Sequence, residues 1–333
     1  MGCNLAIAGV TGAVGQEFLK IIEERDFPFS SLKMLASSRS AGKTIKFKNK
    51  DYIVEEMTKN SFGGVDIALF SAGASRSREF APAAVQAGAV VVDNSSAFRM
   101  DPEVPLVIPE INPQQIQKHK GIIANPNCST IIGIVPVWPL HKANPVKRMV
   151  VSTYQAASGA GQQAMLELEH QAREILAGKP PTCKVLPYQL AFNIYSHNSA
   201  IGPNGYNEEE TKMVKETKKI FDCPDIAITC TCIRIPVFRA HCESINLEFL
   251  TPITPEQVRD LLSTAPGVSI IDDRQNNRFP MPIDTTGKDN ILVGRIRQDE
   301  SIPDNRGINI WVAGDQLRKG AALNAVQIAE KLL

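Results

Sequence analysis

Two residues of this sequence have the types needed for covalent catalysis, a cysteine at position 128 and a histidine at position 241. Cys128 stands in the segment Asn-Pro-Asn-Cys-Ser-Thr (125–130), directly before an apolar run over 131–140. A cysteine at the start of a helix has a lowered thiol pKa, because the helix dipole stabilises the thiolate. Most cysteines are nevertheless small core residues, and a lone histidine is more often structural than catalytic. The spacing alone leaves open whether Cys128 and His241 meet.

A glycine-rich segment at 9–15, Gly-Val-Thr-Gly-Ala-Val-Gly, is the second chemical signal. It lies between a strand-like run and a helical pattern, where glycines let the backbone turn sharply and approach a pyrophosphate. Its spacing departs from G-x-G-x-x-G, so a tight turn without a ligand is the alternative. The position in the first strand-to-helix turn favours a dinucleotide. We expect cofactor contacts at Gly9, Thr11, Gly12, Ala13, Val14 and Gly15.

The residues after the second expected strand indicate which dinucleotide is bound. An enzyme that uses NAD usually places an acidic residue there, to hold the ribose 2′-hydroxyl. Here the segment holds hydroxyls and a guanidinium and no acid, which suits a 2′-phosphate. A solvated polar loop is the alternative. We therefore predict NADP, held at Ser37, Ser38, Arg39 and Ser40.

Strands that alternate with helices are predicted for the first 125 residues. Strands are expected near 4–8, 32–36, 66–70 and 89–92. Between the first two, apolar residues recur at helical spacing and form one face, made of Val14, Phe18, Ile21 and Ile22. This alternation predicts right-handed βαβ units and a parallel sheet of the Rossmann type.

The sequence changes character from about residue 146, where longer β-rich runs appear with fewer helices between them. They cover 146–155, 227–237, 244–250, 291–297 and 307–313. They predict an α+β domain on a mixed or antiparallel sheet. The Ala-rich segment 316–333 predicts a terminal helix. We expect a cofactor domain over 1–127, completed by a helix at 315–333, and a catalytic and dimerisation domain over 128–314.

Composition limits the classes of function. Among 333 residues, 43% are hydrophobic and 21% charged, as in soluble globular proteins, and the net charge of +1 gives no field that would recruit nucleic acid or a membrane. The seven cysteines are an odd number, which favours reduced thiols over disulfides. Cys230 and Cys232 sit in a β-branched run without a second ligand pair, so packing is preferred over a metal. We expect a cytoplasmic protein, or one of an organelle stroma if a targeting segment has been removed.

Seven stretches, taken together, resemble the aspartate-semialdehyde dehydrogenase family along nearly the whole chain. Each is weak singly, but they occur in the order found in the family: 9–15, 36–42, 93–99, 125–130, 154–161, 209–212 and 234–241.

This resemblance implies an NADPH-dependent reaction, in which L-4-aspartyl phosphate gives L-aspartate 4-semialdehyde and phosphate. The pathway would be that of the aspartate-family amino acids: lysine and its precursor diaminopimelate, threonine and methionine. Cys128 would form a thioester and His241 would act as general acid and base. Asn127 and the backbone at Cys128 would stabilise the oxyanion, and Gln155 would position the substrate.

The resemblance also implies how the substrate and cofactor are held. Arg99 and Lys212 match the phosphate-binding positions, Arg234 the clamp for the substrate α-carboxylate, and Glu209 the residue facing the α-ammonium. Neighbouring acids leave the choice within 208–210 open, and exposed charges are the alternative for these residues. Further cofactor contacts are expected at Ser71, Gly73, Ser158, Gly159 and Gln316.

Three other functions are alternatives for this sequence. N-acetylglutamyl-phosphate reductase and glyceraldehyde-3-phosphate dehydrogenase share the fold and chemistry, but typically carry Gly-Cys-Tyr and Ser-Cys-Thr-Thr-Asn at the nucleophile, whereas this chain has Asn-Cys-Ser-Thr. A non-catalytic NADP-binding sensor could dispense with the thiol and the base, which are both present. Partners are expected to be the small substrate, phosphate and a second copy in a homodimer, with a tetramer as the alternative.

Overall fold

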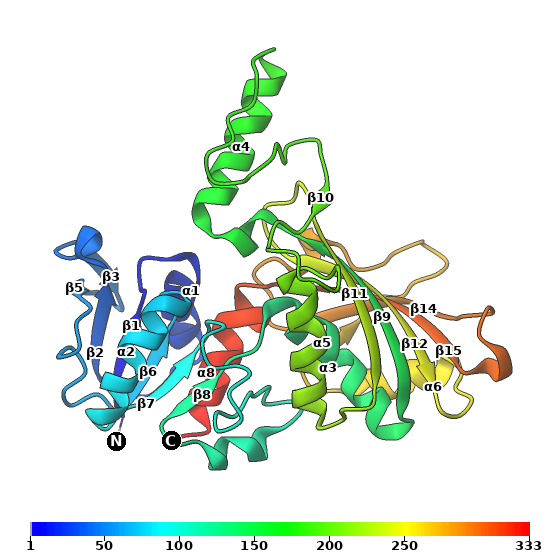
Figure 1. Cartoon of the computed structure of the whole chain (residues 1–333), viewed down its shortest axis with the longest axis horizontal. Coiled ribbons are helices and arrows are strands. Elements are labelled where there is room, and N and C mark those ends of the chain that lie inside the picture. The colour runs from blue at the N-terminus through cyan, green and yellow to red at the C-terminus, as the bar shows by residue number, and fades with distance from the viewer. Residues whose placement is uncertain (1) are drawn as a thin grey trace. The chain divides into compact units, whose positions relative to one another are not determined.

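We describe a computed structural model of the chain, which covers residues 2–333 (Figure 1). The chain forms two compact units. The first extends to Asn127 and also includes Ala321–Leu333, whereas the second is Cys128–Gly320. The first unit is therefore discontinuous in sequence, because the chain returns to it at its carboxyl end.

A six-stranded sheet in which every pair of neighbours is parallel forms the centre of the first unit. Its strands lie in the order β5 (Glu55–Glu56), β2 (Phe29–Ala36), β1 (Cys3–Ala8), β6 (Ile67–Phe70), β7 (Val90–Asp93) and β8 (Ile122–Ala124). This confirms the parallel sheet and all four expected strands of this region. A hairpin of β3 (Thr44–Phe47) and β4 (Lys50–Ile53) was not expected from the sequence.

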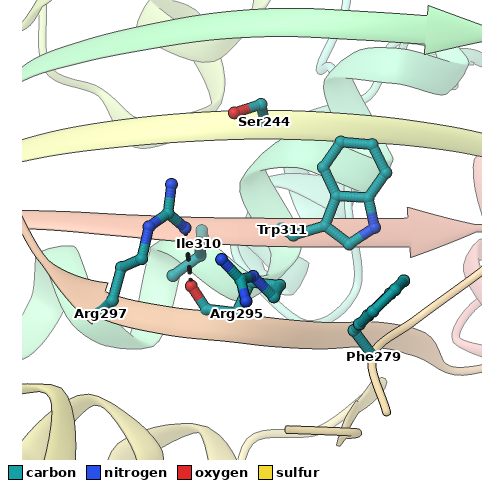
Figure 2. A pocket seen from close by; sticks show the side chains of 6 residues that line it. All are labelled: Ser244, Phe279, Arg295, Arg297, Ile310 and Trp311. Carbon is teal, nitrogen blue, oxygen red and sulfur yellow. Dashed lines mark hydrogen bonds between the residues drawn. The ribbon is translucent and has the colours of Figure 1, made fainter. Parts of the chain in front are cut away.

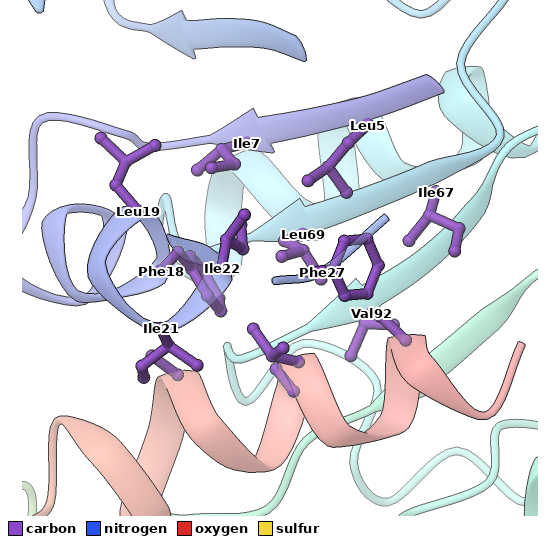
Figure 3. Packing of buried hydrophobic residues seen from close by; sticks show 14 of the residues in the cluster. Leu5, Ile7, Phe18, Leu19, Ile21, Ile22, Phe27, Ile67, Leu69 and Val92 are labelled. Atoms are coloured by element: carbon purple, nitrogen blue, oxygen red, sulfur yellow. The ribbon is translucent and has the colours of Figure 1, made fainter. Parts of the chain in front are cut away.

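Helix α1 (Ala13–Glu24) covers this sheet with the face that the sequence pattern predicts. Phe18, Ile21 and Ile22 are fully buried, and Val14 packs partly buried against the same core. Figure 3 shows Phe18, Ile21 and Ile22 between the strands and the C-terminal helix, drawn in pale red. That helix, α8, spans Leu323–Glu330 and is preceded by a π-helical turn over Arg318–Ala322. It is thus shorter than the expected helix over 316–333.

The second unit is built on a seven-stranded mixed sheet, which confirms the expected class. Its strands lie in the order β10 (Tyr195–Ser196), β11 (Ala227–Arg234), β9 (Val146–Gln155), β12 (His241–Phe249), β15 (Gly307–Gly314), β14 (Ile291–Gln298) and β13 (Val268–Ile270). The β11–β9 and β14–β13 pairs are parallel and the others antiparallel. All five β-rich runs correspond to long strands.

One face of this sheet is covered by helices. Helices α3 (Cys128–Ala143), α5 (Glu208–Phe221) and α6 (Pro255–Ser263) pack against its strands and against one another. Helix α3 is apolar nearly all round and almost wholly buried, which explains why its sequence reads as a continuous apolar run. The side chain of Glu243 on β12 reaches α3 at Gly133, where a Cβ atom would stand 2.4 Å from Oε2.

An arm over residues 162–194 interrupts the second unit between β9 and β11. Helix α4 (Gln162–Leu176) extends away from the sheet of its own unit in Figure 1. A small core that includes Ala164, Leu168 and Leu186 holds the arm together. The carboxylate of Glu167 supports it by accepting hydrogen bonds from the backbone N–H groups of residues 184–186, at 2.7–2.8 Å.

Within residues 2–333, every helix falls short of the combination of length and apolar character that a membrane-spanning helix requires. The seven cysteines are all free thiols in the structure, and Cys230 and Cys232 are buried with their sulfur atoms 3.6 Å apart.

Candidate active site

The sulfur of Cys128 lies 3.6 Å from Nε2 of His241. Cys128 is the first residue of α3, and His241 the first residue of β12. The other ring nitrogen of His241, Nδ1, accepts a hydrogen bond from the backbone N–H of Ala156 at 3.1 Å. The ring proton must then be on Nε2, so that the imidazole donates toward the sulfur. This arrangement fits a thiolate beside a neutral histidine.

Burial of His241 supports the neutral form. The ring is fully buried, and this burial lowers its pKa to about 3, with the cation of Arg234 acting in the same direction and Glu209 opposing. The thiolate has two further sources of stabilisation, the helix start at α3 and the nearby guanidinium of Arg234. The site therefore holds a nucleophile next to a fixed hydrogen-bond donor.

Sheet register brings the other polar residues of the second unit to the same place. Arg234 and Gln155 are the last residues of the parallel strands β11 and β9, and they are direct register partners. On the other side of β9, Cys242 pairs with Tyr154, which brings the start of β12 and hence His241 beside Gln155. Arg234 and Gln155 are only 2% and 1% exposed. Arg234, Gln155 and His241 thus form a polar row whose members come from segments that are far apart in sequence.

A hydrogen-bond network links this row to helices α3 and α5. Nε2 of Gln155 donates to Oγ of Ser129 at 2.8 Å and to Oε1 of Glu209 at 3.1 Å. The other oxygen of Glu209 forms an ion pair with Nζ of Lys212 at 3.2 Å. Glu209 therefore gives the site a buried negative charge, which is opposite in sign to the guanidinium of Arg234.

The structure separates the roles of the three neighbouring acids at the start of α5. Glu208 is exposed, whereas Glu209 and Glu210 are buried. Glu210 and Asn207 form a capping box at the start of the helix, and Oε1 of Glu210 accepts from the backbone N–H of Cys232. Only Glu209 is joined to Gln155 and Lys212, which supports it as the acid that faces a substrate.

Glycine at position 159 leaves room around the guanidinium and the imidazole. A Cβ atom there would lie 3.0 Å from Nη1 of Arg234 and 3.3 Å from Nε2 of His241. The neighbouring Ser158 is buried, and its hydroxyl accepts a hydrogen bond from Nε2 of Gln316. Oε1 of Gln316 in turn accepts from the backbone N–H of Ala240, whose φ of 76° is rare for a residue with a side chain. These three predicted cofactor contacts therefore lie beside the His241 turn.

Arg99 belongs to the first unit, in the loop that follows β7. Its Nε donates to the carbonyl of Asn125 at 2.9 Å, and Nη2 donates to the carbonyl of Asn94 at 2.8 Å. These carbonyls follow the carboxyl ends of β8 and β7, the edge at which ligands of open parallel sheets bind. Arg99 is thus a buried, backbone-anchored cation. Asn127, also buried, is the last residue of this part of the unit and directly precedes Cys128.

The glycine segment of the first unit has the geometry of a phosphate cradle. A Cβ atom on Gly9 would lie 2.4 Å from the carbonyl oxygen of Ser71, and one on Gly15 would lie 2.2 Å from the carbonyl oxygen of Gly9. The start of α1 at Ala13 has no side-chain cap and no acid in its first turn. Its N–H groups can therefore bind an anion. Gly73, with a φ of 89°, occupies the corresponding position before α2 (Ala74–Gln86).

The residues expected to hold a 2′-phosphate follow β2. Ser38–Ser40 form a short 3₁₀ turn after Ser37, and the side chains of Ser38 and Arg39 are exposed. No acidic residue stands within Ser37–Ser40, but Glu55 and Glu56 of β5 pair with Leu35 and Ala36 at this strand end. The serine hydroxyls and the guanidinium of Arg39 are hydrogen-bond donors that suit the 2′-phosphate of NADP.

Three residues that belong to this site were missed by the sequence reasoning. His197 contacts the guanidinium of Arg234, and Ser129 contacts Gln155. Glu243 is fully buried, and both of its carboxylate oxygens are without a hydrogen-bond partner among residues 2–333. Burial raises the pKa of Glu243 well above its usual value. Sheet register reveals His197 and Glu243, and the packing of α3 on the sheet reveals Ser129, whose adjacency to Cys128 was a weak signal.

A metal centre finds no support among the residues that the structure describes, which contain no cluster of three or more potential His, Cys, Asp or Glu ligands.

Comparison with known proteins gives matches over both units. Residues 4–119 match the family model "Semialdehyde dehydrogenase, NAD binding domain", and residues 137–319 match "Semialdehyde dehydrogenase, dimerisation domain". The chain is 57% identical over 330 residues to the aspartate-semialdehyde dehydrogenase of Synechocystis sp., covering 99% of this chain and 97% of the relative. It is 46% identical over 339 residues to that of Bacillus subtilis, covering 99% and 97%.

Solved structures resemble this one along the whole chain. Aspartate semialdehyde dehydrogenase II from Vibrio cholerae, complexed with ASA, has 45% sequence identity and a TM-score of 0.96, with 100% of this chain and 98% of that chain covered. The enzyme from Candida albicans with NADP has 25% identity and a TM-score of 0.76, with coverage of 100% and 98%.

Proposed function

The chain belongs to the aspartate-semialdehyde dehydrogenase family, and we propose on this basis that it converts L-4-aspartyl phosphate to L-aspartate 4-semialdehyde and phosphate with NADPH. The observation that carries the proposal is the Cys128–His241 pair, with its sulfur 3.6 Å from Nε2 and its imidazole held in the donor tautomer. A buried cation at Arg234 and a buried anion at Glu209 flank it, which suits a substrate with both an α-carboxylate and an α-ammonium group.

The first chemical step uses the thiolate. Sulfur of Cys128 attacks the acyl carbon of aspartyl phosphate, the carbon–oxygen bond to phosphate breaks, and a thioester remains. Phosphate leaves with the bonding electrons, and Arg99 and Lys212 are proposed to hold its charge. The thioester carbonyl then lies beside Nε2–H of His241, which polarises its oxygen.

Reduction of the thioester needs a hydride, which NADPH supplies when bound. The tetrahedral oxyanion that results is stabilised by Nε2–H of His241 and, as we propose, by Asn127 and the backbone at Cys128. The oxyanion collapses to the aldehyde and expels the thiolate, so the atoms and charges balance. In these steps His241 serves as a hydrogen-bond donor, in place of the general acid and base that the resemblance implies. Gln155, fixed by Ser129 and Glu209, would hold the substrate in position.

The cofactor assignment rests on the glycine cradle and on the segment after β2, where Ser37–Ser40 contains hydroxyls and a guanidinium and no acid. We propose that the pyrophosphate lies at Gly9, Thr11, Gly12, Ala13, Val14 and Gly15. The 2′-phosphate would bind at Ser37, Ser38, Arg39 and Ser40. Ser71, Gly73, Ser158, Gly159 and Gln316 would complete the contacts, with the last three near the nicotinamide. The cofactor domain would cover 1–127 with the carboxyl-terminal helix, and 128–314 would form the catalytic domain.

The reverse reaction gives a direct test. Incubation with aspartate semialdehyde, phosphate and NADP⁺ should produce NADPH absorbance that depends on all three components. Glyceraldehyde 3-phosphate and N-acetylglutamate semialdehyde in place of the substrate should give little. Saturable NADP binding without turnover of any of these aldehydes would contradict the proposal and favour a sensor. The relatives named above bear neither of the alternative enzyme names. The free thiols suit a reducing cytoplasm or organelle stroma.

We further propose that two copies assemble through the second unit, which matches a dimerisation-domain model. Exposed apolar side chains concentrate on the arm: Leu166, Leu176, Val185, Tyr188, Phe192 and Ile194. Such a concentration is typical of a protein interface. The half-exposed ring of Trp311 on β15 also contributes apolar surface, and its indole N–H donates to the carbonyl of Pro280 at 2.9 Å.

A pocket of about 320 Å³ lies beside Trp311, as Figure 2 shows. Trp311 and Phe279 line it with two guanidinium groups, Arg295 and Arg297. Glu248 of β12 places a carboxylate at an outward-facing position of the same sheet, where it forms an ion pair with Lys147 at 2.8 Å. An isologous interface allows the cations of each copy to meet acids of the other. These features favour a second copy of the chain as the occupant.

Sedimentation or light scattering should give the mass of two chains. Leu176→Asp combined with Tyr188→Asp should shift the protein toward monomer, whereas Ile53→Asp, at an equally exposed apolar residue of the first unit, should leave the mass unchanged. A monomeric parent protein, or equal effects of both variants, would contradict the proposed interface. A mass of four chains would extend it to a tetramer.

A further inference from the structure

His197 contacts the residue that is proposed to clamp the substrate, although none of the sequence motifs includes it. Its backbone N–H donates to the carbonyl of Cys232 at 2.8 Å, directly after β10, and Tyr195 of β10 pairs with Arg234. The strand pairing therefore holds the imidazole over the end of β11. Its Nε2 lies 2.9 Å from Nη2 of Arg234, and its Nδ1 lies 3.1 Å from Oγ of Ser199.

The contact with Arg234 fixes the protonation of His197. A guanidinium only donates hydrogen bonds, so Nε2 must accept, and the ring is neutral with its proton on Nδ1. That proton points to Ser199, whose hydroxyl oxygen also accepts from the backbone N–H of Glu209 at 3.2 Å. A longer contact from the backbone N–H of Ser199 to Nδ1, at 3.3 Å, favours the other tautomer. The contact between Nε2 and the charged Nη2 of Arg234 is shorter, at 2.9 Å, and charge-assisted, so it outweighs this one.

The surroundings of His197 also favour the neutral ring. Burial lowers its pKa to about 4. The cations of Arg234 and Lys212 act in the same direction, and the anion of Glu209 opposes them. The imidazole is therefore an uncharged acceptor at neutral pH.

The hydrogen bonds of Arg234 show what this acceptor does. Nη1 donates to the carbonyl of Ala156 at 2.8 Å, and Nη2 donates to His197. Nε of Arg234 is buried and has no hydrogen-bond partner within residues 2–333. The two anchored nitrogens fix the plane of the guanidinium and leave Nε–H, beside the second hydrogen on Nη2, as a donor edge on which Nε has no partner among residues 2–333. Such an edge matches the two oxygens of a carboxylate.

We propose that His197 is a positioning residue that orients Arg234 toward the substrate α-carboxylate without cancelling its charge. An acid at position 197 would also orient the guanidinium, but it would compete with the substrate for the same cation. A neutral base avoids this competition, because it accepts a hydrogen bond and leaves the positive charge available. This inference rests on the proposed function, since it assigns a role within that substrate site.

The test compares three variants and two aldehydes. His197→Gln keeps a neutral acceptor, His197→Leu removes it, and His197→Glu replaces it with a competing anion. Aspartate semialdehyde has the carboxylate, whereas 3-aminopropanal is the same aldehyde without it. We expect kcat/KM for aspartate semialdehyde to fall slightly in the Gln variant, about tenfold in Leu and up to about a hundredfold in Glu. Values for 3-aminopropanal, KM for phosphate and KM for NADP⁺ should change little.

Controls separate this role from a structural one. Asn198→Glu places the same charge on the adjacent exposed residue and should leave both substrates unaffected. Thermal unfolding identifies variants that fail to fold, and His197→Gln keeps the test valid if His197→Leu is unstable. Equal losses on both aldehydes, or no loss in a folded His197→Glu enzyme, would overturn the inference while the parent enzyme stays active. A parent enzyme without activity on aspartate semialdehyde would instead overturn the proposed function.

Discussion

The glycine segment of the first unit and the polar row of the second unit differ in the groups that would contact a ligand. At Gly9 and Gly15 the ligand would meet backbone, and side chains are excluded because a Cβ atom would overlap a carbonyl oxygen. In the second unit, buried side chains such as Arg234 and Gln155 form the site, and the backbone only sets their register. A site made of backbone depends on local sequence, whereas a site made of side chains depends on the sheet.

The largest effect is expected from the second unit, at its nucleophile. Cys128→Ala should reduce turnover by several orders of magnitude, because the covalent intermediate is lost, while the fold and NADP affinity are retained. Steady-state kinetics and a cofactor binding titration measure the two properties. Cys183→Ala, at an exposed thiol of the same unit, is the matched control and should stay active. Appreciable turnover by the Cys128 variant would rule out the thioester.

Substitution of two arginines, one in each unit, should impair the binding of different substrates. Arg99→Leu should raise KM for phosphate and Arg234→Leu should raise KM for aspartate semialdehyde, each about tenfold to hundredfold. A charge-assisted contact is worth roughly 1.5–3 kcal/mol, which gives this range. Initial rates in the reverse reaction, with each substrate varied in turn, measure both constants. Equal penalties on the two substrates in both variants would remove the assignment of separate anion sites.

A series of glycine substitutions tests the backbone site. Gly15→Ala should weaken NADP binding and destabilise the first unit by about 1–3 kcal/mol, because its Cβ atom would lie 2.2 Å from a carbonyl oxygen. Gly12→Ala should have a smaller effect, since the nearest atom there is 3.4 Å away, and Gly63→Ala meets no atom within 4 Å. Thermal unfolding and cofactor titration should rank the variants in this order. A tolerated Gly15→Ala would contradict the close approach.

Cofactor choice should respond to charge after β2. Ser38→Asp should shift the preference from NADP toward NAD by about tenfold, because the carboxylate repels the 2′-phosphate. The measurement is the ratio of kcat/KM for the two cofactors. Ser30→Asp, at an exposed serine near the opposite end of the same strand, is the control. An unchanged ratio would place the 2′-phosphate elsewhere.

The smallest effect concerns the buried carboxyl of Glu243. Its folded-state pKa is raised, so it binds a proton that the unfolded chain releases above the usual carboxyl pKa of 4.5. The stability that Glu243 gains from binding this proton is therefore complete below the unfolded-state pKa and is lost as the pH rises through the folded-state pKa. Glu243→Gln should make the unfolding temperature less dependent on pH between mildly acidic and alkaline conditions. Parallel pH profiles for both proteins would show that Glu243 is ionised in the folded state.

Much of the fold could be predicted because local periodicity reflects burial. The face of α1 and the long strands β9, β11, β12, β14 and β15 were all indicated by the sequence. The hairpin of β3 and β4 was not, because Lys-Asn-Lys-Asp interrupts its apolar pattern at positions 48–51. The two-residue strand β10 is too short to have a period, yet it places His197 beside Arg234.

The site was predictable only in part, because a local sequence pattern does not show which distant segments pair. The glycine segment can be recognised locally, and family motifs pointed to Cys128, His241 and Arg234. Their convergence depends on strand pairing between distant segments and on the packing of α3 against the sheet, since Cys128 and His241 are 113 residues apart in sequence. Residues without a motif, such as His197 and Glu243, become visible only when the register of the sheet is known.

The apolar surface of the arm has a consequence for how the protein matures after synthesis. A newly made single chain would expose Leu176, Phe192 and Ile194 to the crowded cell until it met another copy. Its exposure time would then be set by a second-order encounter, which slows as the protein becomes scarce. Weak expression or strong dilution would leave chains open to chaperones and aggregation for longer. Recovery of activity on refolding should accordingly depend on protein concentration.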